Sequence, residues 1–355
     1  MSESTKKRAR LRQHSHSEAH PATTVSTTAT EGPEGPIRAF VWRPDGSVAE
    51  IDTAEAIQTS FQDTTTRLWI DLESASAKTL EGIATCLELH PLIVEDIVER
   101  NQRAKVEYTA GTMHLVFFAL RYEGELVPVE LDIVLGERFL LSSHPPEWRP
   151  ADQANIKRNG AGHFLGIGVD HVLWAVVDAA VDGYFPVFDT LGDEIEDLQD
   201  DVLRRPTPWV VERLFKVRRE LLEIRHAVSP EREVFNQLTN RENPLIDPER
   251  VIYFRDVYDH LIRLTDELDS YRELVSTTLD AYLSTVNNNL SDIMKRLTAV
   301  TVTLALVGAL AGVFGMSEAG LAFDFAEQPG FWIVTVIVIA AGGIAFAYFR
   351  RIGWI

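Results

Sequence analysis

The sequence predicts an α+β aqueous domain, with a mixed and largely antiparallel sheet and flanking helices, that leads by one very long helix into two transmembrane helices. Three observations predict this fold class. Two uncharged apolar runs lie close to the C-terminus, an unbroken apolar stripe with helical spacing precedes them, and strand-like segments fill the first half of the chain. The 355 residues, of which 45% are hydrophobic, leave ample material for a folded core.

Residues 1–36 are predicted to form a disordered tail, because small and polar residues dominate and apolar periodicity is absent. The basic, polar start lacks the apolar stretch of a secretory signal peptide, so no such peptide is expected. His14, His16 and His20 could bind a metal, although a flexible polar tail is the simpler interpretation.

Residues 37–247 are predicted to form a cytosolic α/β domain with a helical hairpin. From Ile37 to about Pro145 the segments are strand-like, with glycine-containing turns between them. Short turns between the later strands favour antiparallel pairing. One helical stretch, 76–101, is expected to interrupt these strands.

The rest of this domain is predicted to be helical. One helix is expected over 170–203, ending before Pro206. A second is expected over 209–229, ending at Pro230, because proline removes a backbone donor and clashes with the preceding turn. A short segment, 231–241, would follow.

Residues 248–296 are predicted to form a stalk helix, with Asp247 as its N-cap and Pro248 in its first turn. Apolar residues recur in steps of three and four, and neither Pro nor Gly interrupts them until Gly308. Joined to the first apolar run, this helix would be on the order of 100 Å long at 1.5 Å per residue. Such a stripe needs identical neighbours, so we expect a parallel homo-oligomeric bundle.

Transmembrane helices are predicted over 297–316 and 331–349, because each run approaches the roughly 20 residues that cross a ~30 Å hydrocarbon core. The loop 317–330 holds acidic residues and no Lys or Arg, whereas basic residues precede the first span and occur in the basic C-terminal segment 350–355. By the positive-inside rule the loop is external and both termini are cytoplasmic. The expected location is the inner (plasma) membrane, with the lipid bilayer as a partner.

The net charge of −19 disfavours nucleic acid as a partner, because phosphate binding needs a basic surface. It favours cations, although solubility alone also explains it. No phosphate-binding glycine motif follows a strand and no residues have the spacing of a catalytic group, so neither a nucleotide partner nor an enzyme is expected. Because Cys86 is the single cysteine, a disulfide within the chain is excluded.

Four places in the chain resemble the CorA family of divalent-cation transporters. They are His90–Asp96 (HPLIVED) with Gln102–Glu107 (QRAKVE), Tyr253–His260 (YFRDVYDH), Asp292–Thr298 (DIMKRLT), and Gly315–Ser317 (GMS) in place of the family's Gly-Met-Asn signature. The resemblance implies a funnel-shaped homopentamer whose first spans line a central pore and whose second spans pack outside. It implies Mg²⁺ as the main substrate, often with Co²⁺ or Ni²⁺, and Zn²⁺ in one branch.

The resemblance also implies where the ion path lies. The selectivity mouth would comprise Gly315, Met316, Ser317 and Glu318, whose five serines and five carboxylates would replace the family's ring of asparagines. The pore face would comprise Asp280, Asn287, Ser291, Met294, Leu297, Thr301, Ala305, Gly308 and Gly312. Small and weakly polar residues suit a hydrated Mg²⁺, which sheds water reluctantly, and Leu297 would gate by excluding water.

Structural roles other than ion conduction also explain parts of this path. Gly308 and Gly312 also form a GxxxG helix-packing motif, and Asp280 could lie on a solvated helix face. Asp256 is the expected ligand of a regulatory Mg²⁺ between subunits. Its acidic partner from the neighbouring α/β unit is not identified from the sequence.

The resemblance therefore predicts a channel-like passive transporter that moves Mg²⁺, and also Co²⁺, into the cytoplasm. The membrane potential would drive it and cytosolic metal would gate it. One alternative is a transporter of another divalent ion such as Zn²⁺, with or without proton coupling. Another is a poorly conducting, membrane-anchored metal sensor or scaffold, for which Ser317 in the signature is the motive.

Overall fold

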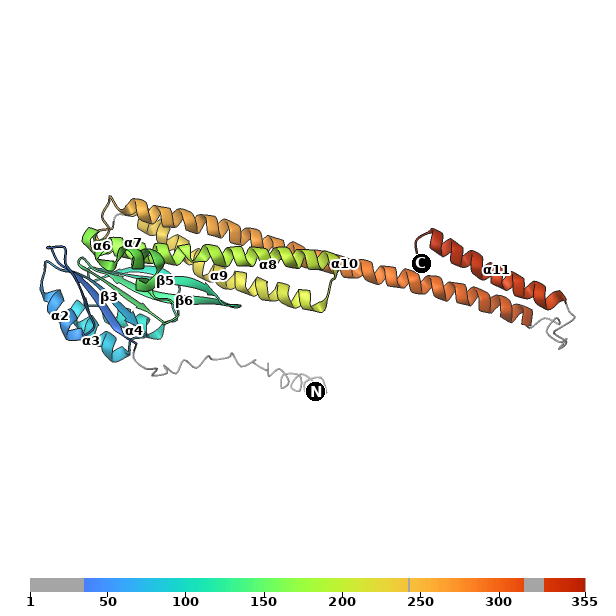
Figure 1. Ribbon diagram of the computed structural model, residues 1–355, viewed down its shortest axis with the longest axis horizontal. Coiled ribbons are helices and arrows are strands. Elements are labelled where there is room, and N and C mark those ends of the chain that lie inside the picture. Colours follow the sequence, from blue (N-terminus) through green and yellow to red (C-terminus); the bar gives the residue numbers. More distant parts are fainter. Residues whose placement is uncertain (1–34, 242, 316–328, 355) are drawn as a thin grey trace, which may run out of the picture.

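The computed structural model describes residues 35–241, 243–315 and 329–354. A sheet domain occupies one end of an elongated molecule, and a long helix extends from it to the other end (Figure 1). The predicted tail 1–36, apart from its last two residues, and most of the predicted loop 317–330 lie outside the described residues.

Within the described residues the domain contains one seven-stranded sheet, in the order β2-β1-β3-β7-β6-β5-β4. The strands are β1 (Ile37–Trp42), β2 (Val48–Ile51), β3 (Arg67–Glu73), β4 (Lys105–Thr109), β5 (Thr112–Tyr122), β6 (Leu126–Leu135) and β7 (Phe139–His144). Strands β3 and β7 are parallel and the other neighbours are antiparallel. The predicted mixed, largely antiparallel sheet is confirmed.

Three helices cover one face of this sheet: α2 (Ala54–Gln62), α3 (Ala77–Leu87) and α4 (Pro91–Glu99). The sequence analysis missed α2 and predicted a single helix over 76–101. That helix is in fact two, because Glu88 takes a left-handed conformation that ends α3. His90 then caps α4, its Nδ1 accepting a hydrogen bond from the N–H of Leu92 at 3.2 Å.

The other face carries a larger helical layer. After a short 3₁₀ turn (Pro150–Asp152) come α5 (Ala154–Asn159), α6 (Ala161–Ile167), α7 (Val169–Asp182), α8 (Tyr184–Arg204) and α9 (Pro208–Asn240). The helix expected over 170–203 is divided at Gly183, between α7 and α8.

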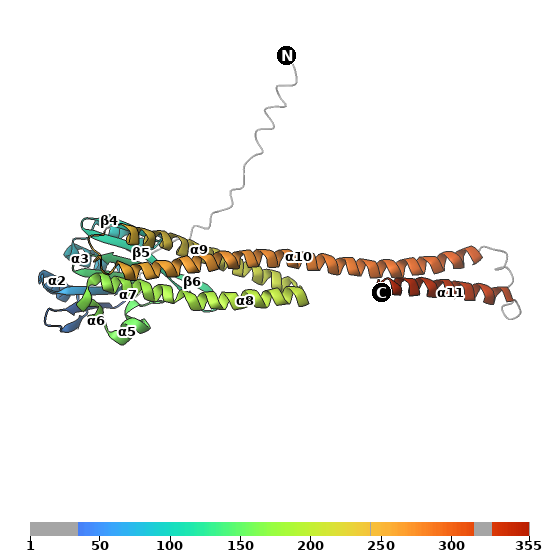
Figure 2. The ribbon, with the colours of Figure 1, turned by 90° about the horizontal axis from the view of Figure 1, so that it is seen from above.

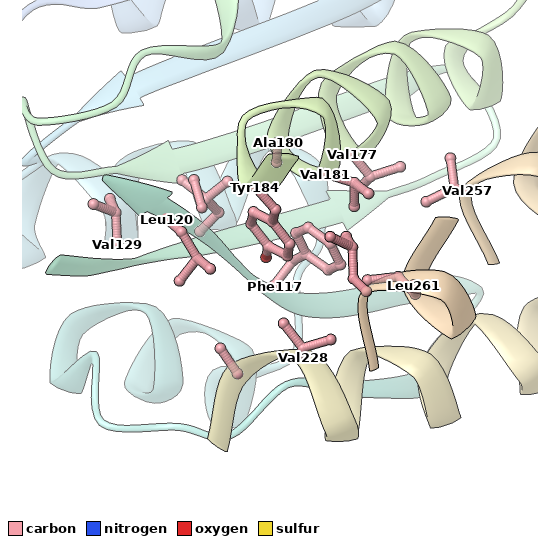
Figure 3. Packing of buried hydrophobic residues seen from close by; sticks show 14 of the residues in the cluster. Phe117, Leu120, Val129, Val177, Ala180, Val181, Tyr184, Val228, Val257 and Leu261 are labelled. Carbon is pink, nitrogen blue, oxygen red and sulfur yellow. The ribbon is translucent and has the colours of Figure 1, made fainter. Parts of the chain in front are cut away.

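The helix end expected at Pro230 is wrong, because α9 continues through this proline. Proline removes one backbone donor and bends the helix, but packing on both sides holds the two halves together. Val228 before it and Val234 and Phe235 after it are all fully or nearly fully buried. Figure 3 shows Val228 close to Phe117 of β5, in the core between sheet and helices.

A buried carboxyl follows this proline directly. Glu231 is fully buried, and its Oε1 accepts a hydrogen bond from the N–H of Phe118 at 2.9 Å. Its Oε2 lies 2.9 Å from the hydroxyl of Tyr184, which in turn donates to the carbonyl of Phe118 at 2.6 Å. Burial raises the pKa of Glu231 well above its usual range. A protonated carboxyl completes this ring, since it donates to Tyr184 while Tyr184 donates to Phe118.

We expect Glu231→Gln to become more stabilising, relative to wild type, as the pH rises. The raised pKa means that the folded chain holds a proton that the unfolded chain has lost above about pH 4.3. Wild-type stability from this group is therefore complete below that pH and is lost as the pH rises through the folded-state pKa. Glutamine keeps both hydrogen bonds without titrating. Thermal unfolding between about pH 5 and 8 measures the gap.

The exposed Glu233 on the same helix provides the control, because Glu233→Gln should show no such trend. A gap between Glu231→Gln and wild type that stays constant with pH would mean that the buried carboxyl is ionised. Glu231→Leu removes the partners of Phe118 and Tyr184 and should cost about 1 to 3 kcal/mol for each buried group left unpaired.

Helix α10 (Val251–Gly315) has 65 residues and spans about 100 Å at 1.5 Å per residue. Figures 1 and 2 show it lying along α8 and α9 and then continuing beyond their ends. It begins three residues later than predicted. Asp247 caps the preceding turn instead, its Oδ1 accepting from the N–H of Glu249 at 2.9 Å. Arg250 fixes that turn, with its Nε 2.7 Å from the buried Asp170 of α7.

The apolar stripe of α10 has two different environments. Its first half is buried against α8 and α9 of the same chain, through Phe254, Val257, Leu261, Leu264, Leu268 and Val275. Its second half is exposed in the single chain, through Leu283, Val286, Leu290, Ile293 and Leu297. The expectation that the whole stripe packs on identical neighbours is therefore wrong for the first half, because the chain's own helices already cover it.

Candidate functional site

The membrane-side half of α10 has one face occupied by the last helix. Helix α11 (Pro329–Arg351) runs back along it (Figure 1). Ala299 is fully buried on this side, and a Cβ added to Gly342 of α11 would lie 3.0 Å from Val307. At about 100° per residue these two α10 positions share a face, which α11 therefore covers.

The residues predicted to line a pore lie on the opposite face. At the same angular spacing, Thr301, Ala305, Gly308 and Gly312 point about half a turn away from Ala299. All nine predicted positions on α10 are exposed in the single chain: Asp280, Asn287, Ser291, Met294, Leu297, Thr301, Ala305, Gly308 and Gly312. The chain thus leaves uncovered one continuous face, without a Lys or Arg among these positions, that runs from the domain to the end of α10.

The side chains on the membrane part of this face are also small, and two of its positions are glycines. A Cβ added at Gly308 or Gly312 would meet no atom within 4 Å. Within the part of the chain that the structure describes, nothing of the chain itself therefore requires glycine at these two positions. Glycine in the middle of a helix costs roughly 0.5–1 kcal/mol relative to alanine.

The predicted selectivity mouth is described only at its first residue. Gly315 is the last residue of α10, and Met316, Ser317 and Glu318 lie outside the described residues. Their assignment to the mouth stays a prediction.

The predicted regulatory residue belongs to an acidic group within the chain. Asp256 of α10 is exposed, and its charge and that of Asp182 both act on Asp178 of α7; we call these three residues the stalk acidic group. Burial, and then the charge of Asp182, raise the pKa of Asp178 to about 6, with Asp256 adding to the rise and His260 opposing it. Carboxylate oxygens are the ligands that Mg²⁺ prefers.

Sequence reasoning named Asp256 and missed its two neighbours. Their spacing was an available signal, because Asp178 and Asp182 lie four residues apart and so share a helix face. The expected acidic partner in the α/β unit of a neighbouring subunit stays a prediction.

Among the described residues, α10 is the helix long and apolar enough to cross a membrane. The second predicted span coincides with α11, whose Lys, Arg, Asp and Glu residues are limited to Arg350 and Arg351 at its end. An α+β domain carried on a helix that continues as an uncharged, membrane-length segment defines a membrane protein with a large aqueous domain.

Comparison with known proteins identifies the family. The family model described as "CorA-like Mg2+ transporter protein" matches residues 65–351, and the chain belongs to this family. The chain is 31% identical over 304 residues to the cobalt/magnesium transport protein CorA of Thermotoga maritima, covering 83% of this chain and 85% of that protein. The family resemblance noted in the sequence is confirmed.

Two further comparisons bear on the fold and the ion. The structure of the CorA magnesium transporter from Methanocaldococcus jannaschii matches with a TM-score of 0.71 at 22% identity, covering 89% of this chain and 98% of that one. This match confirms the predicted fold class. The zinc transport protein ZntB of Pectobacterium atrosepticum is 26% identical over 187 residues, covering 52% of this chain and 55% of that protein.

Proposed function

We propose that five copies of this chain form a channel-like transporter that carries Mg²⁺, and also Co²⁺, across the inner membrane into the cytoplasm. The observation that carries the proposal is the uncovered face of α10, which is continuous from the domain into the membrane and lies opposite α11. Family membership and the names of the relatives support the choice of ions.

The exposed half of the stripe supports assembly. Leu283, Leu290, Ile293 and Leu297 are each more than half exposed in the single chain. An apolar row of this length requires a partner, and parallel copies of the same helix place identical rows against one another. Closely packed α10 helices would then enclose the face that carries Gly308 and Gly312.

The driving force is the membrane potential, worth about 2.3 kcal/mol per charge per 100 mV and about twice that for a divalent ion. Such a path needs no coupling to a nucleotide. Cytosolic Mg²⁺ bound at the stalk acidic group would gate the path, because Asp256 of this group lies on the same helix as the pore face.

Uptake into proteoliposomes that contain the purified protein and a Mg²⁺-sensitive dye tests the proposal. We expect Mg²⁺ influx that increases with an inside-negative potential, and Co²⁺ influx in parallel vesicles. Vesicles with intact, correctly inserted protein and no flux of any ion would contradict it and favour the sensor or scaffold.

Zinc transport is the second candidate. The similarity to ZntB, which covers 52% of this chain, supports it. Zn²⁺ uptake without Mg²⁺ uptake would support it, and a pH gradient would reveal proton coupling. The variant Ser317→Asn separates the remaining cases. A competent transporter should change mainly its ion preference, whereas a scaffold that is otherwise sound should gain conductance.

A further inference from the structure

A polar cluster outside the ion path lies at the β4 edge of the sheet, on the face covered by α3 and α4. Asp96 of α4, Glu107 of β4 and His114 of β5 each offer one ligand atom, and these three atoms lie within 4.8 Å of one another. Glu107 and His114 face each other across the β4–β5 pairing, so both side chains emerge on the same side. We call these three residues the edge cluster.

The surroundings of His114 resemble those of a metal-binding histidine. Its side chain is fully buried, and its Nε2 lies 3.0 Å from the carboxylate of Asp132, which is also fully buried. Its other nitrogen, Nδ1, has no hydrogen-bond partner among the described residues. Ligating histidines usually present one nitrogen to the metal while a carboxylate orients the other. A buried nitrogen without a hydrogen-bond partner destabilises the folded chain and therefore requires an explanation.

The ammonium group of Lys105 lies between the two carboxylates of the edge cluster. The Nζ of Lys105 lies 2.7 Å from Asp96 Oδ2 and 3.3 Å from Glu107 Oε2. Its ammonium thus forms an ion pair with each of the two carboxylates of the edge cluster. About a quarter of the Lys105 side chain is exposed, so it can leave toward solvent without crossing the core. The cluster can thus exchange one monovalent cation for a divalent one.

We propose that Asp96, Glu107 and the Nδ1 atom of His114 bind a divalent transition-metal ion of the Co²⁺ or Zn²⁺ type, and that Lys105 takes the place of the ion in the metal-free chain. One imidazole with two carboxylates suits these ions, whereas Mg²⁺ prefers oxygen ligands alone. The bound metal would tie α4 to the sheet edge. This site differs from the stalk acidic group, which offers only carboxylates.

Binding of Co²⁺ to the purified full-length protein in detergent tests the proposal, with excess Mg²⁺ present to saturate all-oxygen sites. Equilibrium dialysis gives the stoichiometry, and the visible absorption of Co²⁺ reports its ligands. We expect one such site per chain in wild type, lost in His114→Gln and weakened at least roughly tenfold in Asp96→Asn and Glu107→Gln. Asp132→Asn, which disturbs only the orientation of the imidazole, should weaken binding roughly 10–100-fold.

Two further variants separate the site from a fold defect. Glu95→Gln removes an exposed carboxylate from the same helix and should leave Co²⁺ binding unchanged. Lys105→Gln removes the competing ammonium and should tighten binding, a gain that misfolding cannot produce. Wild-type stoichiometry and affinity in all the cluster variants, or no tightening in Lys105→Gln, would overturn the proposal and leave a purely structural histidine–aspartate pair. Because binding is measured in detergent, the result does not depend on whether the protein conducts ions.

Discussion

Replacing Gly312 by leucine is expected to abolish ion uptake while the fold of the chain stays intact. In the single chain a Cβ at this position would meet no atom within 4 Å, so the leucine itself creates no clash there. In the proposed assembly the same position faces a narrow central path, where five added side chains would fill the space available to a hydrated ion. Uptake in proteoliposomes should decrease roughly tenfold or more, whereas far-UV circular dichroism should be unchanged.

Gly343 supplies the matched control. It lies on α11, and a Cβ added there also meets no atom within 4 Å. Gly343→Leu adds the same side chain to the helix that packs outside in the proposed assembly, so uptake should be close to that of wild type. Equal uptake by the Gly312 and Gly343 variants would mean that the predicted face does not line the path.

Replacing Phe254 by alanine is expected to destabilise the domain by about 3 to 5 kcal/mol, the range for large aromatic side chains in a core. Phe254 is 1% exposed and joins α10 to α9, where its ring lies 6.4 Å from that of Phe235. Truncation leaves a cavity between two long helices that cannot close independently. Chemical unfolding of the full-length protein, followed by tryptophan fluorescence, measures the loss.

Ile252, two residues earlier on α10, is 64% exposed, so Ile252→Ala should change stability by less than about 0.5 kcal/mol. A small effect of Phe254→Ala would show that the first half of the stripe contributes little to the folded domain. In that case α10 would depend on neighbouring subunits along its whole length.

The sequence predicts the architecture well where periodicity is long and strong. The steps of three and four in α10 and the uncharged run of its C-terminal part give a continuous helix, and short turns give antiparallel strands. The turn at Glu123 and Gly124 between β5 and β6 illustrates this, since Gly124 has a positive φ of 82°, which glycine adopts at no steric cost.

Local exceptions escape such patterns because tertiary packing decides them. Pro230 resembles a helix end, yet buried residues on both sides carry α9 through it. Glu88 has no glycine-like signature and still ends α3 in a left-handed conformation. The exposure of half the α10 stripe also depends on how far α8 and α9 reach, which no pattern within α10 reveals.

The residues of the candidate site also differ in how far the sequence predicts them. The face of α10 could be predicted because helical spacing alone determines which residues share it. The neighbours of Asp256 and the edge cluster could not, because they combine residues from separate elements. His114 meets Asp96 only after the β4–β5 hairpin and α4 have come together.

The burial of the first half of α10 also affects how the protein is made. Because Phe254, Leu264 and Val275 belong to the core of the domain, the ribosome must complete α10 as far as Val275 before that core can close. The membrane segment that begins near Leu297 follows roughly twenty residues later, about 1 to 4 s of synthesis at ~5–20 residues per second. Closure of the soluble domain and entry into the bilayer are therefore nearly simultaneous. Until the first half of α10 has been made, the apolar faces of α8 and α9 stay exposed.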